Sequence, residues 1–335
     1  MSADDRLPGM TTGPRIAVPA GGVGAARFLR GLRIAAPDAQ ITVIGNTADD
    51  ITLFGLRVCP DLDTVMYTLG GGIAEDQGWG RADESFHVAD ELAAYGAGPD
   101  WFSLGDRDLA THVIRTQMLS AGYPLSAVTA ALCERWSPGV SLLPMSDDRV
   151  ETHVVIEDAA APGGQRAVHF QEYWVRLHAR PRAIDVVPVG VEDAKPGPGV
   201  LEAIATADIV LLPPSNPVVS IGTILAVPGI RAALADTAAP VVGVSPIVGG
   251  APVRGMADRL LEAIGVESTA AAVARHYGPE LLDGWLVDER DAGLVDDVAA
   301  LGIACRAVPL MMSDPQAAAE MARAAMDLAG AGRPA

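Results

Sequence analysis

Short runs of branched apolar residues, each followed by a loop and then by a helical pattern, are the feature that most constrains the fold of this chain. Four runs show it clearly, at Arg15 to Val18, Ile41 to Ile44, Ala207 to Leu212 and Pro240 to Val244. Nearly continuous apolar strands that alternate with helices are typical of a parallel sheet covered on both faces. We expect functional residues in the loops after these strands, because ligands bind at the carboxyl edge of such sheets.

The alternation is interrupted between residues 69 and 136, where one helical pattern follows another. The expected helices there are Asp83 to Tyr95, Asp108 to Ala121 and Ser126 to Trp136. The sequence thus predicts an α/β fold: a Rossmann-like, mostly parallel sheet with helices on both faces and a mainly helical insertion at about 69–136. We expect a single domain over residues 14–330, after a disordered leader at residues 1–13.

A second interruption lies between Val150 and Val189. Thr152 to Ile156 and Val168 to Val175 alternate in the manner of antiparallel strands, with a turn at Gly163-Gly164 between them. We therefore expect antiparallel strands in this region, outside the parallel sheet.

The charge balance restricts the partners of the chain. There are 24 Lys and Arg residues against 42 Asp and Glu, for a formal charge of −18. Nucleic acid and anionic membranes need a basic surface, so neither is expected as a partner, and small molecules or a second copy are favoured. Cys59, Cys133 and Cys305 make no metal-binding or CxxC spacing, which fits a reduced, cytoplasmic protein.

The basic residues are 23 Arg and a single Lys, Lys195, in a turn-rich stretch. No glycine-rich loop of this chain can therefore end in the lysine of a P-loop. Gly21, Gly22 and Gly24 nevertheless follow the first strand and precede a helix, where backbone N–H groups bind phosphate. The alternative is a tight strand-to-helix turn without a ligand.

Carboxylates gather in two segments, Asn46-Thr47-Ala48-Asp49-Asp50 and Pro60-Asp61-Leu62-Asp63-Thr64. Clustered carboxylates beside a phosphate loop repel each other and the ligand unless a divalent cation lies between them. Oxygen ligands favour Mg²⁺, held by one or two carboxylates and substrate phosphate. The alternative is helix capping, since Asp50 and Asp63 both precede stretches that look helical.

Four further loops carry polar groups. In Leu104-Gly105-Asp106-Arg107-Asp108, Asp108 is expected to cap the next helix while Asp106 and Arg107 face a ligand, and Pro144 to Arg149 is a second acidic turn. Both segments are equally well explained as solvated turns. The loops at Ser215-Asn216 and Ser245-Pro246-Ile247 follow two strands, and their donors suit a phosphate or a neutral polar head group.

The motifs that could form a binding or catalytic site follow one another along the chain from about Ile16 to Met312. They are Gly21-Gly22-Val23-Gly24, Asn46-Thr47-Ala48-Asp49-Asp50, Pro60-Asp61-Leu62-Asp63-Thr64, Gly78-Trp79-Gly80, Ser103-Leu104-Gly105-Asp106-Arg107-Asp108, Pro144-Met145-Ser146-Asp147-Asp148, Phe170-Gln171-Glu172, Pro214-Ser215-Asn216-Pro217 and Ser245-Pro246-Ile247. In this order the chain resembles the 2-phospho-L-lactate transferases of coenzyme F-420 biosynthesis, whose actinobacterial members are phosphoenolpyruvate transferases.

The resemblance implies a reaction in which a GMP-activated diphosphate, carrying phosphoenolpyruvate or 2-phospholactate, gives its phosphoester group to the ribityl hydroxyl of the deazaflavin Fo and releases GMP. It also implies that Asp63 and Ser103 line the deazaflavin site, although archaeal relatives place a basic residue at the position of Ser103. A homodimer is the assembly that the resemblance suggests.

Combined with the loops, this reaction leads to one hypothesis about the site. Asp49, Asp50 and Asp63 supply Mg²⁺ ligands, and Asp50 and Asp63 act catalytically by orienting the attacking hydroxyl. The residues expected to bind the nucleotide and its phosphates are Gly21, Gly22, Gly24, Asn46, Ser215, Asn216 and Ser245.

Two other functions share parts of this pattern. Nucleotide-sugar-binding regulators of a related fold share the glycine loop and an acidic pair, but they carry Gly and Ser straight after that pair, where this chain has Ile51-Thr52-Leu53. A nicotinamide dehydrogenase needs an acidic residue about twenty positions beyond the glycine loop. Asp38 comes too early for that role.

Overall fold

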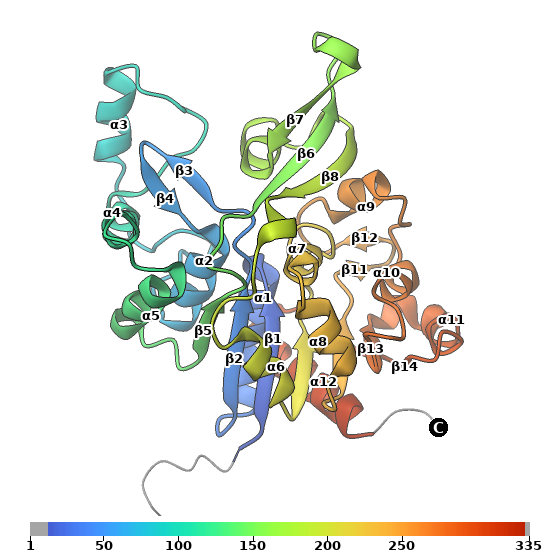
Figure 1. Ribbon diagram of the computed structural model, residues 1–335. Coiled ribbons are helices and arrows are strands. Elements are labelled where there is room, and N and C mark those ends of the chain that lie inside the picture. Colours follow the sequence, from blue (N-terminus) through green and yellow to red (C-terminus); the bar gives the residue numbers. More distant parts are fainter. Residues whose placement is uncertain (1–12, 332–335) are drawn as a thin grey trace, which may run out of the picture.

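The computed structural model describes residues 13–331, in which a seven-stranded parallel sheet organises an α/β fold (Figure 1). The expected leader at residues 1–13 lies outside the described residues except for Gly13. The strand order is β14-β13-β10-β9-β1-β2-β5. The strands are β1 (Arg15–Ala20), β2 (Gln40–Gly45), β5 (Ser141–Pro144), β9 (Ile209–Leu212), β10 (Val241–Val244), β13 (Gly284–Val287) and β14 (Ala304–Ala307). The four strands expected from the sequence are all present.

The middle strand, β1, pairs with β2 on one side and with β9 on the other, and both pairings are parallel. The chain leaves β1 toward β2 and later returns on the opposite side at β9. The order of strands therefore reverses at β1, and such a switch point opens a crevice at the carboxyl ends of the strands.

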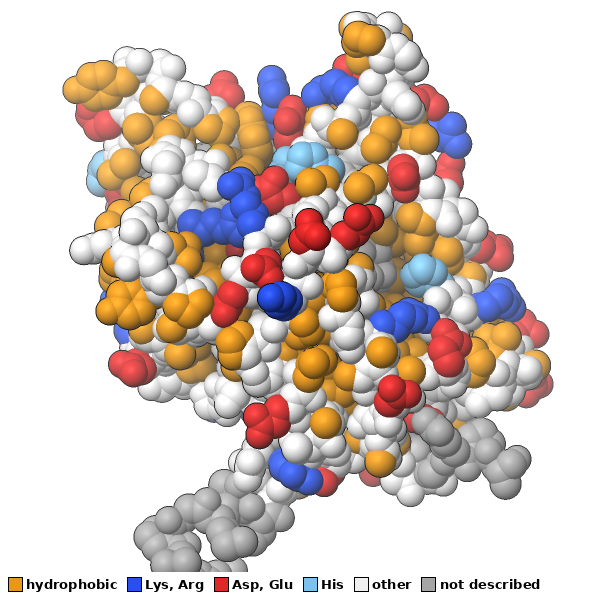
Figure 2. Space-filling view, in the orientation of Figure 1, with side chains coloured by type: hydrophobic (Ala, Val, Ile, Leu, Met, Phe, Trp, Pro, Cys, Tyr) orange, Lys and Arg blue, Asp and Glu red, His pale blue; other side chains and the backbone are white. Residues whose placement is uncertain are grey.

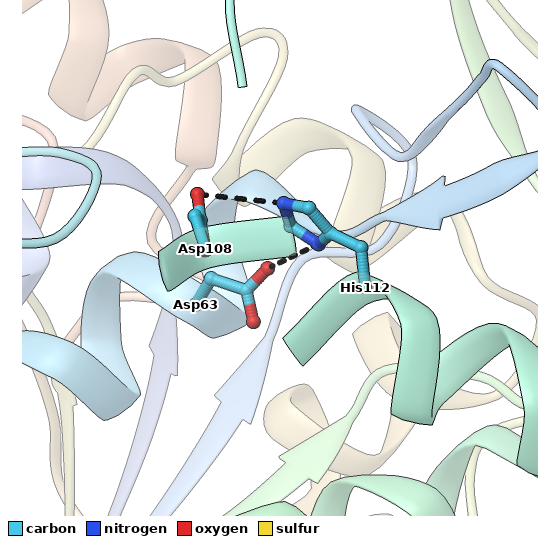
Figure 3. Close-up of side chains that lie close together, drawn as sticks. All are labelled: Asp63, Asp108 and His112. Carbon is cyan, nitrogen blue, oxygen red and sulfur yellow. Dashed lines mark ion pairs between the residues drawn. The ribbon is translucent and has the colours of Figure 1, made fainter. Parts of the chain in front are cut away.

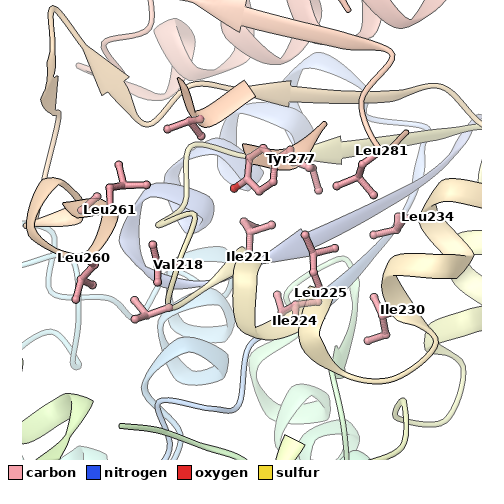
Figure 4. Close-up of a cluster of buried hydrophobic side chains, with 14 of the residues drawn as sticks. Val218, Ile221, Ile224, Leu225, Ile230, Leu234, Leu260, Leu261, Tyr277 and Leu281 are labelled. Atoms are coloured by element: carbon pink, nitrogen blue, oxygen red, sulfur yellow. The ribbon is translucent and has the colours of Figure 1, made fainter. Parts of the chain in front are cut away.

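Two hydrophobic cores lie on the two faces of the sheet, because successive residues of a strand point to opposite sides. Along β1, Ala17 belongs to one core while Ile16 and Val18 belong to the other. The first core is packed by α6 (Val200–Ala205), α7 (Ile221–Ala226), α8 (Ile230–Asp236), α9 (Ala257–Ala263), α10 (Ala270–Tyr277) and α11 (Val295–Ala299). Figure 4 shows part of it, with Ile221, Ile224 and Leu225 of α7 facing Tyr277 and Leu281.

The second face is covered by α1 (Gly22–Ala35), α2 (Pro60–Leu69) and α12 (Pro315–Gly330). Helices α1 and α12 meet at Gly31. A Cβ atom on Gly31 would lie 2.3 Å from the carbonyl carbon of Ala318 and 2.5 Å from the backbone nitrogen of Ala319. The two helices can pack this closely only because residue 31 has no side chain.

The segment after α2 carries α3 (His87–Ala94), α4 (Asp106–Ser120) and α5 (Leu125–Trp136), in the region where successive helices were expected. Helix α3 is shorter than expected at its start. The reason is that the Asp106 carboxylate accepts hydrogen bonds from the backbone N–H groups of His87 and Val88, both at 3.0 Å, and so fixes the first turn there.

A three-stranded antiparallel sheet, β6 (Glu151–Glu157), β7 (Gln165–His169) and β8 (Ala183–Val189), confirms the antiparallel region. The expected strand from Val168 to Val175 is wrong beyond His169, because Glu172–Arg176 form a π-helical turn. Phe170 and Trp174 stack there at helical spacing, with 6.2 Å between ring centroids. Smaller elements are β3 (Ile51–Leu53), β4 (Leu56–Val58), β11 (Ile247–Val248), β12 (Ala251–Pro252) and 3₁₀ turns at Pro162–Gly164, Val191–Asp193 and Glu289–Leu294.

Within residues 13–331, no helix combines the length and the apolar character that crossing a bilayer requires.

The contact between α1 and α12 gives a prediction for stability. Alanine is intrinsically better than glycine inside a helix by about 1 kcal/mol. At Gly31, however, the added methyl group meets the backbone of α12, so we expect Gly31→Ala to lower the free energy of unfolding by about 1–3 kcal/mol. Urea unfolding measures the change. Gly330→Ala is the matched control, since nothing lies within 4 Å of its Cβ position, and equal stability of the two variants would contradict the steric argument.

Candidate functional site

The glycine loop after β1 is packed tightly against the loop after β9. The Ser215 hydroxyl donates to the Gly21 carbonyl at 2.9 Å. A Cβ atom on Gly21 would lie 2.7 Å from Asp61 Oδ2, and one on Gly24 would lie 2.5 Å from the Pro214 carbonyl oxygen. Packing alone therefore explains why both positions hold glycine, and their role in binding phosphate remains a prediction.

Asn46, which follows β2, joins three segments through its buried amide. Its Nδ2 donates to Asp61 Oδ2 at 2.9 Å and to the Val219 carbonyl at 3.2 Å. Its Oδ1 accepts from the Thr223 hydroxyl at 2.9 Å and from the Ala48 backbone N–H at 3.0 Å. The side chain thus holds the loop after β2 against α2 and against the segment that begins α7.

Asp61 lies in the first turn of α2 and reaches the beginning of α1, beside Gly21 and Gly22. This is where the sequence places a phosphate. Burial raises the pKa of Asp61 to about 6, although hydrogen bonds from Asn46 and from the Gly22 backbone oppose the rise. The Asp61 carboxylate therefore already lies at the positive, N-terminal end of the α1 dipole, where negative charge is stabilised.

The buried carboxylate of Asp49 is the neighbour of Asp61, and neither has a cationic partner among the described residues. The pKa of Asp49 is raised well above its usual value, first by burial and then by the charge of Asp61. Asp49 Oδ1 and Asp50 Oδ1 are buried and have no hydrogen-bond partner. We call Asp49, Asp50 and Asp61 the acidic centre. Unpartnered carboxylate oxygens of this kind fit Mg²⁺, which prefers hard oxygen ligands.

The second oxygen of Asp50 is neutralised within the protein. Arg57 pairs with it at 3.1 Å, and the Cys59 thiol donates to it at 2.9 Å. Burial nevertheless raises the pKa of Asp50 to about 6. The capping alternative is wrong for this residue, because Asp50 is followed by the short antiparallel pair β3 and β4 and not by a helix.

Asp63 also does not cap a helix, because it lies inside α2, facing α4. Both of its carboxylate oxygens accept hydrogen bonds from the buried guanidinium of Arg115. Burial alone would lower the pKa of Arg115, but the charge of Asp63 raises it above the usual arginine value. The two side chains therefore form an ionised pair that joins α2 to α4.

Asp108 and His112 complete this second group, as Figure 3 shows. His112 Nδ1 lies 3.8 Å from Asp63 Oδ2, and His112 Nε2 lies 3.4 Å from Asp108 Oδ2. The Tyr67 hydroxyl donates to Asp108 Oδ1 at 2.6 Å. Ligand atoms of Asp63, Asp108 and His112 all lie within 4.8 Å of one another, a spacing that suits a metal.

Among the described residues, only Asp63, Asp108 and His112 have the close spacing of a metal-binding group, whereas the acidic centre is a candidate because of its unpartnered, buried oxygens. At Asp63, Asp108 and His112, Arg115 already neutralises Asp63, so an added cation would meet a buried positive charge. The acidic centre has no such cation beside Asp49 and Asp61. Asp49, Asp50 and Asp63 do not form a group with the close spacing of the Asp63 group, and their shared coordination of one ion remains a prediction.

The remaining predicted residues lie at the same edge of the sheet or near it, with most side chains used in their own loops. Asn216 Oδ1 accepts from the backbone N–H groups of Val218 and Val219, at 2.9 and 3.2 Å. The Ser245 hydroxyl donates to the Ile247 carbonyl at 2.8 Å. Ser103 is exposed, between two residues that pack against β3 and β4. These hydrogen bonds do not test whether Asn216 and Ser245 bind the nucleotide or whether Ser103 lines the acceptor site, so these roles stay predictions.

The expectation that Asp108 caps the next helix is wrong, because α4 begins at Asp106 and Asp108 lies inside it. Asp106, which was expected to face a ligand, holds the first turn of α3, whereas Asp108 faces Asp63. The roles of Asp61 and Arg115 and the pairing of His112 were not predicted from the sequence. One signal was available: positions 108, 112 and 115 are four and three residues apart and share one face of a helix.

The surface above these groups is hollowed between the insertion and the β6–β8 sheet, and acidic, Arg and His side chains gather in the hollow (Figure 2). One histidine of this region, His169, connects the β6–β8 sheet to the acidic centre, because its Nε2 lies 3.2 Å from the Asp50 carbonyl oxygen.

The family model and the sequence relatives agree on one family. The family model described as 2-phospho-L-lactate transferase CofD matches residues 16–309. Phosphoenolpyruvate transferases of Streptomyces griseus and Streptomyces coelicolor are 73% and 72% identical over 315 residues, covering 94% of this chain and 98% of each relative. The crystal structure of protein BH3568 from Bacillus halodurans has a TM-score of 0.61 at 20% identity, covers 94% of this chain and 100% of that one, and shows the fold alone.

The Asp63 and Arg115 pair gives a second prediction. Removing the cation leaves a buried carboxylate without its partner, so we expect Arg115→Met to lower the free energy of unfolding by about 3–5 kcal/mol. The double variant Asp63→Asn with Arg115→Met should recover part of this loss, because the unpaired charge is then gone. Urea unfolding of the three variants measures both effects. A loss below about 1 kcal/mol for Arg115→Met would contradict the pairing.

The raised pKa values of the acidic centre give a third prediction. Between pH 5 and 7 the folded protein releases protons from Asp50 and Asp61, whose folded pKa is about 6. The unfolded chain has already lost them, because its carboxyl pKa is about 4. The folded state therefore loses stability as pH rises, by about 1 kcal/mol for each group.

Asp61→Asn removes one of these groups and also the charge that helps to raise the pKa of Asp49. In EDTA, the variant should lose about 1 kcal/mol less stability than the parent between pH 5 and 7. Exposed Asp185 on β8 provides the control Asp185→Asn, which should follow the parent at every pH. Parallel pH profiles for Asp61→Asn and the parent would show that Asp61 keeps an ordinary pKa.

Proposed function

This chain belongs to the 2-phospho-L-lactate transferase CofD family, and we propose that it acts in coenzyme F-420 biosynthesis by transferring a phosphoenolpyruvyl or 2-phospholactyl group from a GMP-activated diphosphate to the deazaflavin Fo. The ribityl hydroxyl oxygen bonds to the phosphorus that carries the acid. The bond from that phosphorus to the bridging oxygen breaks, and GMP leaves. The names of the similar Streptomyces enzymes favour phosphoenolpyruvate as the acid.

The acidic centre is the observation that carries this proposal. Asp49 and Asp61 are buried carboxylates at the switch point of the sheet, with no cationic partner in the part of the chain that the structure describes, and the single lysine cannot serve a P-loop. We assign Mg²⁺ to the free oxygens of Asp49 and Asp50, with Asp61 beside them. When bound, the ion neutralises charge on the diphosphate and on the departing phosphate.

Asp63 is assigned to the acceptor side. Each oxygen of an ionised carboxylate has two lone-pair positions, so Asp63 can accept the acceptor hydroxyl while Arg115 holds its orientation. Transfer of a phosphoryl group depends mainly on positioning and charge, and the proton of the hydroxyl passes to the carboxylate late in the step. A third Mg²⁺ ligand at Asp63 would compete with Arg115, so we favour the role in orientation.

The nucleotide side is assigned to the loops after β1, β9 and β10. The side chains of Ser215, Asn216 and Ser245 form hydrogen bonds with backbone groups of these same loops. We propose that they act by shaping the loops, whose backbone groups then bind the guanylate.

A cytoplasmic homodimer with small-molecule partners only is proposed from the family resemblance, and sedimentation of the purified protein tests the dimer.

The activity is tested by mass spectrometry of the product formed from Fo and each guanylated donor. We expect transfer that requires Mg²⁺, and a loss of about 10²-fold or more in kcat/KM for Asp49→Asn, because a group that holds charge in place is removed. Asp185→Asn is the control and should stay within about twofold of the parent. Absence of product from both donors, or full activity in Asp49→Asn, would contradict the proposal.

A further inference from the structure

Two arginines beside the glycine loop have no acidic partner within residues 13–331, although the chain carries a formal charge of −18. Arg254 follows β12. It donates to the Gln77 carbonyl and lies over the Trp79 ring, 5.5 Å from the ring centroid. Arg27 lies on α1 and makes no hydrogen bond or ion pair with another described residue. Its charge lowers the pKa of Glu75, but that carboxylate pairs with Arg30 at 2.8 Å.

The packing around Gly78 places Arg254 against the glycine loop. A Cβ atom on Gly78 would lie 2.7 Å from Val23 Cγ1 and 3.2 Å from the Arg254 guanidinium nitrogen NH1. Val23 belongs to the first turn of α1, and Arg27 follows it by four residues on the same face of the helix. Both arginines therefore border the outer side of this turn.

The two positive charges oppose each other. Arg254 is an exposed residue, but partial burial of its guanidinium lowers its pKa, and the charge of Arg27 lowers it further. No described carboxylate compensates for this repulsion by pairing with either side chain. A bound anion would do so, and guanidinium groups hold phosphate through paired, charge-assisted hydrogen bonds.

Asp61 gives a reason why a phosphate needs these residues. Its carboxylate already lies at the beginning of α1 beside Gly21 and Gly22, so the helix end alone is a poor phosphate site. We propose that Arg27 and Arg254 form an anion subsite on the outer side of the glycine loop and bind a phosphate group of the donor diphosphate. The identity of the donor rests on the proposed function, whereas the subsite itself requires only a phosphate ligand.

The test is calorimetric titration of the full chain with inorganic pyrophosphate at low salt. Arg254→Gln and Arg27→Gln should each weaken binding about tenfold, and Arg254→Lys should keep part of the affinity because it keeps the charge. Arg135→Gln is the matched control. Arg135 is exposed on α5 and lies over a tryptophan, 5.3 Å from the ring centroid of Trp136, and its loss should leave binding within about twofold.

Arg27→Gln keeps the test decisive if Arg254→Gln disturbs the Gln77 contact, because the Arg27 side chain makes no such contact. Pyrophosphate binding that is absent in the parent, or equal in all the glutamine variants, overturns the subsite. Because pyrophosphate contains neither guanosine nor the transferred acid, a specific loss in these variants supports the subsite even if the product assay fails. The two proposals therefore fail separately.

Discussion

The buried amide of Asn46 is the interaction on which the arrangement of the site depends. It uses all its capacity at once, donating to Asp61 and the Val219 carbonyl and accepting from Thr223 and the Ala48 backbone. A buried polar group is tolerated only when its hydrogen bonds are made. The loops after β2 and β9 and the first turn of α2 therefore have to meet in one arrangement, and that arrangement brings Asp61 to the beginning of α1.

The buried carboxylates around Asn46 fall into two groups, those with a cationic partner and those without one. Asp63 receives a full guanidinium partner, and Asp50 shares one oxygen with Arg57 and Cys59. Asp49 and Asp61 receive no cation from the described part of the chain. Burying a charge without a partner is costly. The carboxylates that have a cationic partner therefore stabilise the fold, whereas we expect those without one to bind a ligand.

The sequence predicted the sheet, its carboxyl edge and the acidic loops, because each depends on local patterns: apolar runs, glycine after a strand, and carboxylates after the next strand. It failed where side chains far apart in the chain decide the outcome. The partner of Asp63 is Arg115, and only the docking of α4 on α2 reveals it. Likewise, the segment after His169 was expected to continue as a strand, yet the stacking of Phe170 on Trp174 favours a helical turn.

The hydrogen bond between Ser215 and Gly21 joins residues 194 positions apart. The glycine loop leaves the ribosome early, but its partner is made only after more than half of the chain has followed. Contacts of such long sequence separation form late, since closing the loop costs entropy before the contact is gained. Fragments that end before β9 consequently lack the contact that fixes the glycine loop, and this loop reaches its final packing only when the second half of the sheet has joined the first.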